Sequence, residues 1–159
     1  MFEALLDKFK ALSEIDGNET IHEILEAQEL QEEIVELNKQ QLLDGRKADN
    51  SSLPRYEDDP FFKTQKAAKA YEAWKLKISP SKNKPAGVMD FYINGKFHDT
   101  IKMKNNSDNF LLTSDSEIAS DVQSKTGNET FGLSEISIGK IIPKLKDSII
   151  EAIKNKIAA

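Results

Sequence analysis

The sequence predicts an α+β fold with an N-terminal helix pair, a small antiparallel sheet and a long C-terminal helix. Apolar residues recur at helical spacing in the first 43 residues and again over 134–157. Between these parts lie shorter apolar runs of strand length, separated by turn-forming residues. A chain of 159 residues fits one structural unit. Within it we expect the acidic helices of residues 1–45 and an α+β domain of residues 46–159.

The composition excludes several classes of protein. The chain has no cysteine, so it holds no disulfide scaffold, cysteine-ligated metal or catalytic cysteine. No apolar run approaches the ~20 residues that a membrane-spanning helix needs, and acidic residues interrupt the N-terminus where a signal peptide would be apolar. We therefore expect a soluble protein that is made inside the cell.

Two helices are expected in the acidic part. The first covers residues 2–14, and its apolar stripe consists of Phe2, Leu5, Leu6, Phe9 and Leu12. The second begins at Thr20, which forms a capping box with Glu23. Its apolar periodicity continues without a break to Leu43, and Gly45 suits the C-terminal cap.

The basic part that follows is expected to contain a loop and a helix. Residues 46–60 are rich in turn formers and lack periodicity, which is typical of an exposed loop. Asp59 and Pro60 favour a helix start, because the first can cap and the second needs no N–H donor there. We predict a helix over 61–77, where aromatic residues alternate with lysines.

The remaining elements are shorter strands followed by helices. Asn94 and Gly95 between apolar runs indicate a two-residue hairpin, although Asp99 would then occupy a core position. A further strand is expected at Phe110–Thr113. The final elements are expected to be a helix over 116–125 that ends at Gly127 and a helix over 134–157 with a kink or new start at Pro143.

Charge is strongly segregated along the chain. Residues 1–45 carry a net charge of −9, residues 46–87 carry +5 and residues 88–159 carry −1. One interpretation is that the acidic helix only presents a solvated face. The other is that the acidic helix of one subunit meets the basic 61–77 segment of a neighbour, head to tail. The candidate interface residues of this second interpretation are Glu29, Glu32, Glu36, Lys66, Lys69 and Trp74.

The chain offers little for catalysis. Neither His22 nor His98 has a second histidine at the spacing of metal ligands. The chain also lacks a motif for an activated serine that either histidine could deprotonate. We expect His98 at the surface. Helix capping explains the acids Glu57–Asp59 better than cation binding does. The chain also lacks a phosphate-binding glycine loop. We predict a protein that is not an enzyme, with no catalytic, cofactor-binding or metal-binding residues.

A different use of the basic segment stays open. Lysines interleaved with Phe, Tyr and Trp over 61–77 suit phosphate contacts and base stacking. The overall acidity argues against nucleic acid, and aromatic residues at helical spacing are typical of a core. The alternative function is therefore a nucleic-acid-binding or cytosolic protein-interaction module that uses this segment.

Three successive segments carry a resemblance to a known family. They are Leu37–Gly45, a polar loop with Tyr56 and Lys63, and Met89–Ile101. The third segment contains a pattern of one glycine, apolar residues at fixed spacings and a hydroxyl residue before the last apolar one. The residues at these positions are Ile93, Gly95, Phe97, Thr100 and Ile101. With the later strand, the short helix before glycine and the final helix, residues 37–157 resemble the neck and tail-completion (virion morphogenesis, head–tail connector) proteins of tailed bacteriophages. They are most similar to those of crAss-like and other Bacteroidota phages.

The resemblance implies a structural virion protein that forms a ring layer in the phage neck or tail junction. Its implied partners are further copies of itself and the neighbouring portal, connector and tail proteins, without a membrane or nucleic acid. It would be made in the host cytoplasm and reside in the virion. The resemblance also favours a short helix within residues 90–99 and a strand at Ile101–Lys104 over the hairpin at residues 94–95.

Overall fold

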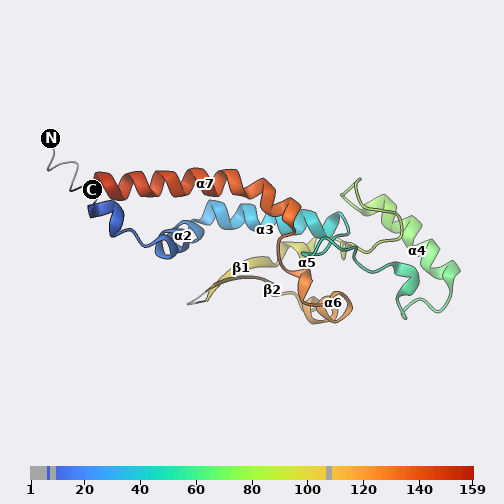
Figure 1. The fold of residues 1–159 in the computed structure, drawn as a ribbon. Helices are drawn as coiled ribbons and strands as arrows, with labels where there is room; N and C mark the ends of the chain where they lie inside the picture. Colours follow the sequence, from blue (N-terminus) through green and yellow to red (C-terminus); the bar gives the residue numbers. More distant parts are fainter. Residues whose placement is uncertain (1–6, 8–9, 107–108) are drawn as a thin grey trace.

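The computed structural model describes residues 7, 10–106 and 109–159, and it has the mixed helix and sheet composition that the sequence predicts (Figure 1). The elements in chain order are α2 (Gly17–Leu25), α3 (Gln28–Leu43), the 3-10 helix η1 (Tyr56–Asp58), α4 (Gln65–Ile78), α5 (Lys96–Asp99), β1 (Ile101–Asn106), β2 (Asn109–Ser114), α6 (Ala119–Thr126), the 3-10 helix η2 (Asn128–Thr130) and α7 (Glu135–Ala158). The long C-terminal helix and the two-stranded antiparallel sheet are confirmed.

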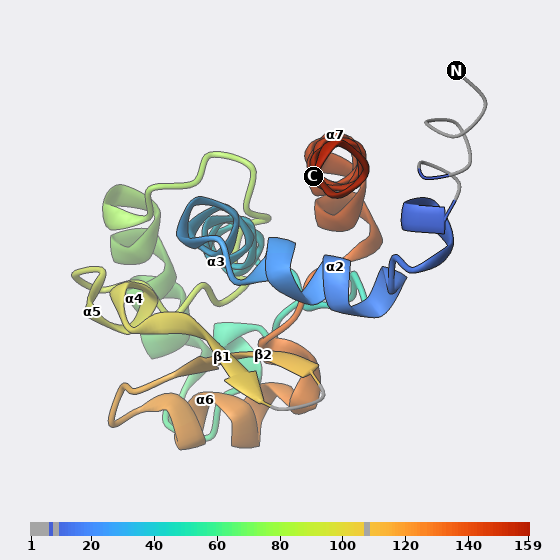
Figure 2. The ribbon, with the colours of Figure 1, turned by 90° about the vertical axis from the view of Figure 1, so that its left-hand side faces the viewer.

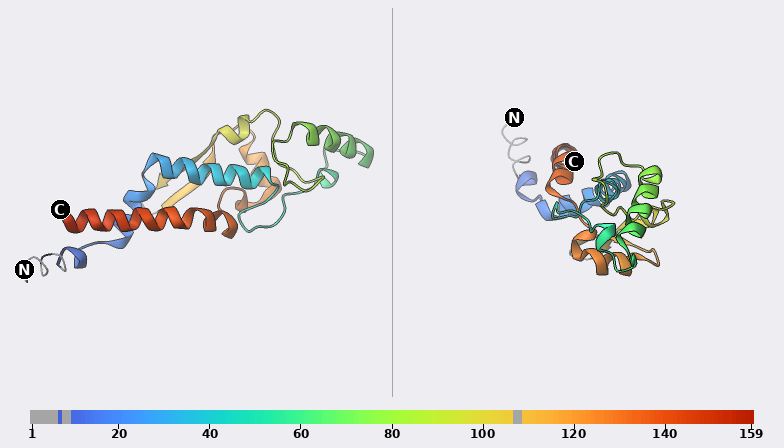
Figure 3. Two further views of the ribbon diagram at one scale, coloured as in Figure 1. Left: turned by 90° about the horizontal axis from the view of Figure 1, so that it is seen from above. Right: turned by 90° about the vertical axis from the view of Figure 1, so that its right-hand side faces the viewer.

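The described chain is elongated. Helices α3 and α7 lie side by side along its length, with α2 against α7 and the β1–β2 hairpin on the far side of α3 (Figures 1 and 2). Helix α4 lies at the end opposite to α2 and the C-terminus of α7 (Figure 3). The two charged helices of the sequence, α3 and α4, therefore occupy different parts of the molecule.

The start of the second acidic helix differs from the prediction. Helix α2 begins at Gly17, three residues before Thr20, because the Asp16 side chain accepts hydrogen bonds from the N–H groups of Asn18 and Glu19 at 2.8 and 3.2 Å. Thr20 lies inside the helix and its hydroxyl donates to the Asp16 carbonyl. Most of the predicted helix over residues 2–14 lies outside the described residues. Within that range, residues 7 and 10–13 are described as helical.

The predicted uninterrupted helix to Leu43 is also wrong. The chain leaves the helix at Glu26, and Ala27 adopts an extended conformation with ψ of 122° before α3 begins. The Gln31 side chain donates to the Leu25 carbonyl at 2.9 Å and so satisfies a group that the break releases. Apolar periodicity does not detect the break, because residues on both sides of it face the same core.

The predicted glycine cap of this helix is confirmed. Gly45 has a φ of +75°, and its N–H donates to the Leu42 carbonyl while that of Arg46 donates to the Gln41 carbonyl. This pair of hydrogen bonds is the Schellman motif. A Cβ atom on Gly45 would lie 2.7 Å from a methyl group of Val88, so glycine is also required by packing.

The loop over 46–60 is only partly exposed, contrary to the prediction. Leu53 and Tyr56 within it are buried core residues, and Arg55 forms an isolated β-bridge with Val88. Helix α4 starts four residues later than predicted, at Gln65, because Thr64 accepts the capping hydrogen bond from the Ala67 N–H.

Asn94 and Gly95 do not form a hairpin turn. Gly95 has a φ of +83° and leads into the single turn of α5, so the helical alternative for residues 90–99 holds for 96–99 alone. The strand that follows extends beyond Lys104 to Asn106 and pairs with β2 from Ile101↔Ser114 to Asn106↔Asn109. The strand predicted at Phe110–Thr113 is therefore confirmed as the centre of β2.

The last two predicted helices are confirmed. Gly127 follows α6 with a φ of +84°, and the Ser134 side chain caps α7 through the Ser137 N–H. Helix α7 passes through Pro143 as one continuous element. Proline lacks an N–H donor, and its ring clashes with the preceding turn, so it bends a helix. The helix does not have to end there when tertiary packing holds the parts before and after the proline.

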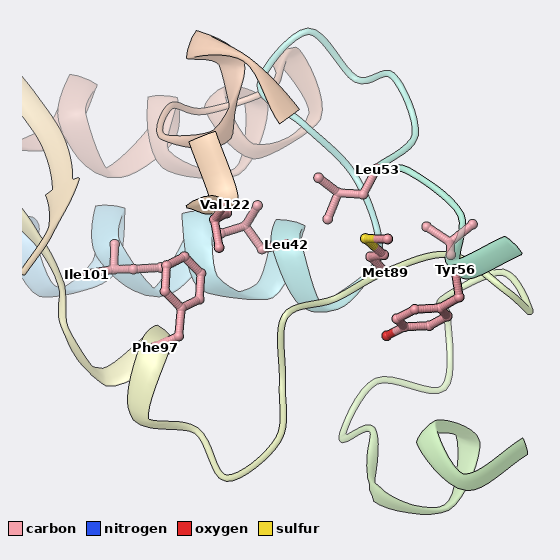
Figure 4. Close-up of a cluster of buried hydrophobic side chains, with 8 residues drawn as sticks. Leu42, Leu53, Tyr56, Met89, Phe97, Ile101 and Val122 are labelled. Atoms are coloured by element: carbon pink, nitrogen blue, oxygen red, sulfur yellow. The ribbon is translucent and has the colours of Figure 1, made fainter. Parts of the chain in front are cut away.

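Two buried apolar clusters hold these elements together. The larger one lies between α3, the loop before α4, α5 and α6 (Figure 4), and consists of Leu42, Leu53, Tyr56, Val88, Met89, Phe97, Ile101 and Val122. The smaller one consists of Leu30, Ile34 and Ile141, and joins α3 to α7. Both clusters combine side chains from before and after residue 45, so the acidic helices and the rest of the chain share a core.

Candidate interaction site

A buried carboxylate lies where α4, η1 and the chain before α5 meet. Asp90 has no exposed surface, and the Lys75 ammonium on α4 lies 2.6 Å from its Oδ1 atom. The Lys84 ammonium lies 3.5 Å from the other oxygen, Oδ2, and is itself almost fully buried. Lys84 also donates to the Val88 carbonyl at 2.7 Å. Two cations therefore share one carboxylate away from water.

Neutral groups complete the coordination of Asp90. The Ser79 hydroxyl donates to Oδ2 at 2.6 Å, the Tyr92 N–H donates to Oδ1 at 3.0 Å and the Tyr56 hydroxyl donates to Oδ1 at 3.4 Å. The ring of Tyr56 also lies beneath the Lys84 ammonium at 5.5 Å. The network ties α4, the loop after it and η1 to one side chain.

The surroundings shift the ionisation of these groups. Burial disfavours the charged form of Asp90, but the hydrogen bonds from Lys75, Ser79 and the Tyr92 N–H outweigh it and hold its pKa below the usual value. Burial lowers the pKa of Lys75, and Asp90 offsets part of that effect. Burial also raises the pKa of Tyr56, whose hydroxyl stays protonated as a donor.

His98 lies beside this network in the protein interior. The prediction of a surface histidine is wrong, because the turn of α5 directs the side chain inward and leaves it 4% exposed. Burial lowers its pKa to about 4. Among the described residues, neither ring nitrogen has a hydrogen-bond partner. The neutral imidazole therefore packs as an aromatic ring, against Phe97 and Tyr92.

An aromatic pocket of about 330 Å³ opens next to the network. Lys75 and Tyr56 form part of its wall, and the other apolar side chains lining it are Phe61, Phe62, Tyr71, Met89, Phe91, Ile93 and Ile118. At one side, Asp59 accepts a hydrogen bond from Lys125 at 2.7 Å. The rim is strongly exposed, since Phe61 and Ile93 keep 78% and 61% of their surface in water. Exposed apolar groups around a pocket of this kind are typical of an interaction site.

The acidic candidates on α3 are exposed but partly neutralised within the chain. Lys144 of α7 lies 3.1 Å from Glu29 and also pairs with Glu33. Glu32 accepts a hydrogen bond from Gln28 at 2.8 Å. Within the described chain Glu36 makes no ion pair, so Glu32 and Glu36 are the acids of this set whose charge α7 does not balance.

The basic candidates on α4 divide between two faces. Lys66 and Lys69 are exposed and three residues apart, which places them on the side of the helix away from buried Ala68 and Lys75. Trp74 instead packs against Tyr71 of the pocket, with ring centroids 5.3 Å apart and ring planes tilted by 51°, and is 43% exposed. The structure thus joins Trp74 to the pocket and leaves the two lysines on the outer surface. It does not bring them to the α3 acids of the same chain.

Neither metal binding nor membrane crossing finds support in the described part of the chain. Among the described residues, no group of three His, Cys, Asp or Glu side chains is placed to hold a metal ion. His22 packs its ring 4.7 Å from Phe110, and Glu57 pairs with Arg55. In the same part of the chain, no helix combines the length and the apolar character that crossing a membrane requires.

Comparison with family models, with curated proteins and with solved structures gives no match for this chain. Sequence reasoning missed the Asp90 network and the pocket beside it. One signal for the network is present in the sequence, because Asp90 interrupts the apolar run from Val88 to Ile93, and a charge at such a position requires a partner.

Proposed function

We propose that the protein is a structural virion subunit that assembles head to tail into a ring layer at the neck or tail junction of a tailed phage, where it binds adjacent connector or tail subunits. The observation that carries the assembly part is the separation of exposed charge on one chain. Glu29, Glu32 and Glu36 are exposed on α3, and Lys66 and Lys69 are exposed on α4. Helix α4 lies at one end of the molecule (Figure 1). The phage part is supported by the resemblance of residues 37–157.

This arrangement suits a heterologous interface. When two different surfaces of one subunit attract each other, each copy uses one surface for each neighbour, and a ring results if the rotation closes. The acids and lysines cannot neutralise each other within one chain, because α3 and α4 occupy different parts of it (Figure 3). Contact between copies would bring them together.

Exposed ion pairs alone are too weak to hold such a ring. Each contributes about 0.2–1 kcal/mol and is screened by salt. We assign them the roles of orienting the subunits and accelerating their association. A stable interface also needs buried apolar anchors, which the aromatic pocket and Trp74 are placed to supply.

Charge reversal tests the assembly. A chain with Glu29, Glu32 and Glu36 changed to Lys should lose assembly or require higher salt, as should a chain with Lys66→Glu and Lys69→Glu. Mixing the two reversed chains should restore association, because each acidic surface again meets a basic one. Reversal of three exposed acids elsewhere, Glu117, Glu135 and Glu151, is the control for net charge. Mass in solution and negative-stain imaging provide the measurements.

Two results would contradict this proposal. If the α3 reversal leaves the mass in solution unchanged, the charged surfaces do not direct assembly. If DNA binding falls steeply with salt and is lost on substitution of Lys66, Lys69 and Trp74, the α4 segment serves nucleic acid instead. The phage assignment is tested by gene order, since we expect capsid, portal and tail genes on either side.

A further inference from the structure

We infer that the aromatic pocket receives the apolar stripe of the N-terminal segment, residues 2–12, from a second copy of the chain. This inference rests on the proposed head-to-tail assembly and names the anchor that the assembly uses. The pocket is the acceptor, lined by side chains of η1, α4 and the chain before α5 and α6. The donor is the segment that precedes α2.

The acceptor has the chemistry of a binding groove for an amphipathic helix. Tyr56, Phe62 and Tyr71 line it as a group of touching rings, with the centroids of each pair 5.1–6.4 Å apart. Phe61 and Ile93 stand exposed at the rim. A volume of about 330 Å³ is at the lower limit for ligand pockets, and suits one or two large apolar side chains better than a nucleotide.

The donor has matching apolar groups. Phe2, Leu5, Leu6 and Phe9 recur at the three- and four-residue spacing by which helices insert anchors into grooves. Leu12, the described residue that continues this stripe, is 47% exposed and belongs to neither buried cluster of the described chain. The stripe therefore continues into a described residue that the protein's own core does not cover.

Because the donor segment leads into α2 and the pocket is lined in part by α4, which lie at opposite ends of the molecule, the contact would join two chains head to tail. Residues 10–16 lead into α2 beside the C-terminal end of α7, whereas α4 lies toward the opposite end (Figures 1 and 3). Two side chains of α4, Tyr71 and Lys75, line the pocket. A segment that leaves one end of a subunit is thus placed to reach the other end of the next one. The same polarity applies to the α3 and α4 charges.

Charge complementarity favours this donor over an uncharged apolar peptide. Residues 1–16 contain four acidic side chains and two lysines, whereas residues 61–77 contain five lysines and one glutamate. Lys75 is balanced by Asp90, but Lys63, Lys66 and Lys69 are exposed. An acidic amphipathic segment next to α4 would gain from these charges as well as from apolar burial.

The absence of cysteine allows a direct test with full-length chains. One chain carries Phe9→Cys and the other Ile93→Cys, at the pocket rim. The two are mixed and treated with a short bismaleimide crosslinker. We expect a crosslinked dimer between the two chains, at a yield several-fold above that with a matched control, Ile150→Cys, whose side chain is exposed on α7. Phe9→Asp in an otherwise unchanged chain should weaken assembly about tenfold or more.

The outcomes separate this inference from the proposed function. If rings form but the Ile93 and Ile150 positions crosslink equally to residue 9, the N-terminal segment does not occupy the pocket and this inference alone is overturned. If the chain stays monomeric at every concentration and no crosslink forms, both the inference and the proposed assembly are overturned.

Discussion

The Lys75 ammonium lies 2.6 Å from the Asp90 carboxylate, and their side chains are 1% and 0% exposed. A buried ion pair of this kind contributes little net stability, since removing two charges from water offsets most of their attraction. Its main consequence is positional. Asp90 can stay ionised only while Lys75, Lys84 and Ser79 surround it, so the pair fixes α4 and the pocket wall relative to the core.

Removal of the carboxylate should therefore unfold or strongly destabilise the protein. Asp90→Asn leaves two lysine ammonium groups buried without a counter-charge, and we expect a loss of about 3–5 kcal/mol in the free energy of unfolding. Urea denaturation at neutral pH measures it. Asp115→Asn is the control, because its pairs with Lys102 and Lys104 are exposed and should change stability by less than about 1 kcal/mol. Equal effects of the two substitutions would contradict the role of the buried network.

His98 should make the protein less stable in mild acid. Its pKa is lowered from 6.5 to about 4 by burial, so the unfolded chain binds a proton between these values and the folded chain does not. Stability should fall by about 3 kcal/mol as the pH decreases from 7 to 4. The contribution of Asp90, whose pKa is lowered, is present above 3.8 and is lost only at lower pH.

Replacing His98 tests this pH dependence. His98→Phe keeps an aromatic ring and removes the titrating group, so urea denaturation from pH 7 to 4 should show a much flatter stability. His22→Gln, which removes the other histidine of the chain, is the matched control variant. A His98→Phe chain that loses stability as steeply as the parent would show that another group is responsible.

The buried amide of Gln41 should be needed to anchor α7 on α3. Its Oε1 atom accepts hydrogen bonds from the Ser134 N–H at 2.8 Å and the Ser137 hydroxyl at 3.2 Å, and its Nε2 donates to the Gly132 carbonyl. Gln41→Met leaves the buried Ser134 N–H without a partner, whereas the Gly132 carbonyl keeps its hydrogen bond from Asn38 and the Ser137 hydroxyl stays next to that of Ser134. We therefore expect a loss of about 1–3 kcal/mol in unfolding free energy. Gln40→Met, on the exposed side of the same turn, should change it by less than about 0.5 kcal/mol. Similar losses would contradict the anchoring role.

Two glycines should respond oppositely to alanine. Gly45→Ala places a Cβ atom at a φ of +75° and 2.7 Å from Val88, and should destabilise by about 2 kcal/mol or more. Gly139→Ala introduces a methyl group into α7 where no atom lies within 4 Å, and should stabilise by about 0.5–1 kcal/mol. Thermal denaturation of both variants measures the difference. A stabilising Gly45→Ala would show that the Schellman cap is not required.

Local signals predicted the elements whose ends depend on a few adjacent residues. Gly45 ends α3 and Gly127 follows α6, because a left-handed residue after a helix needs no distant partner. Predictions failed where two local signals competed. Helix α2 is capped by Asp16 and not by Thr20, and helix α4 is capped by Thr64 and not by Asp59. Gly95, with its positive φ, precedes the helical turn α5 and does not form a hairpin turn.

The sequence by itself determined the fold class, the long C-terminal helix, the strand at residues 110–113 and the segregation of charge, since each depends on periodicity or on residues close together in the chain. Only the tertiary structure decided that Lys75 is buried on Asp90, that His98 is internal and that Trp74 packs against Tyr71 of the aromatic pocket. These outcomes depend on contacts between segments far apart in the chain. Such contacts determine which face of a helix is removed from water, and a linear pattern does not specify them.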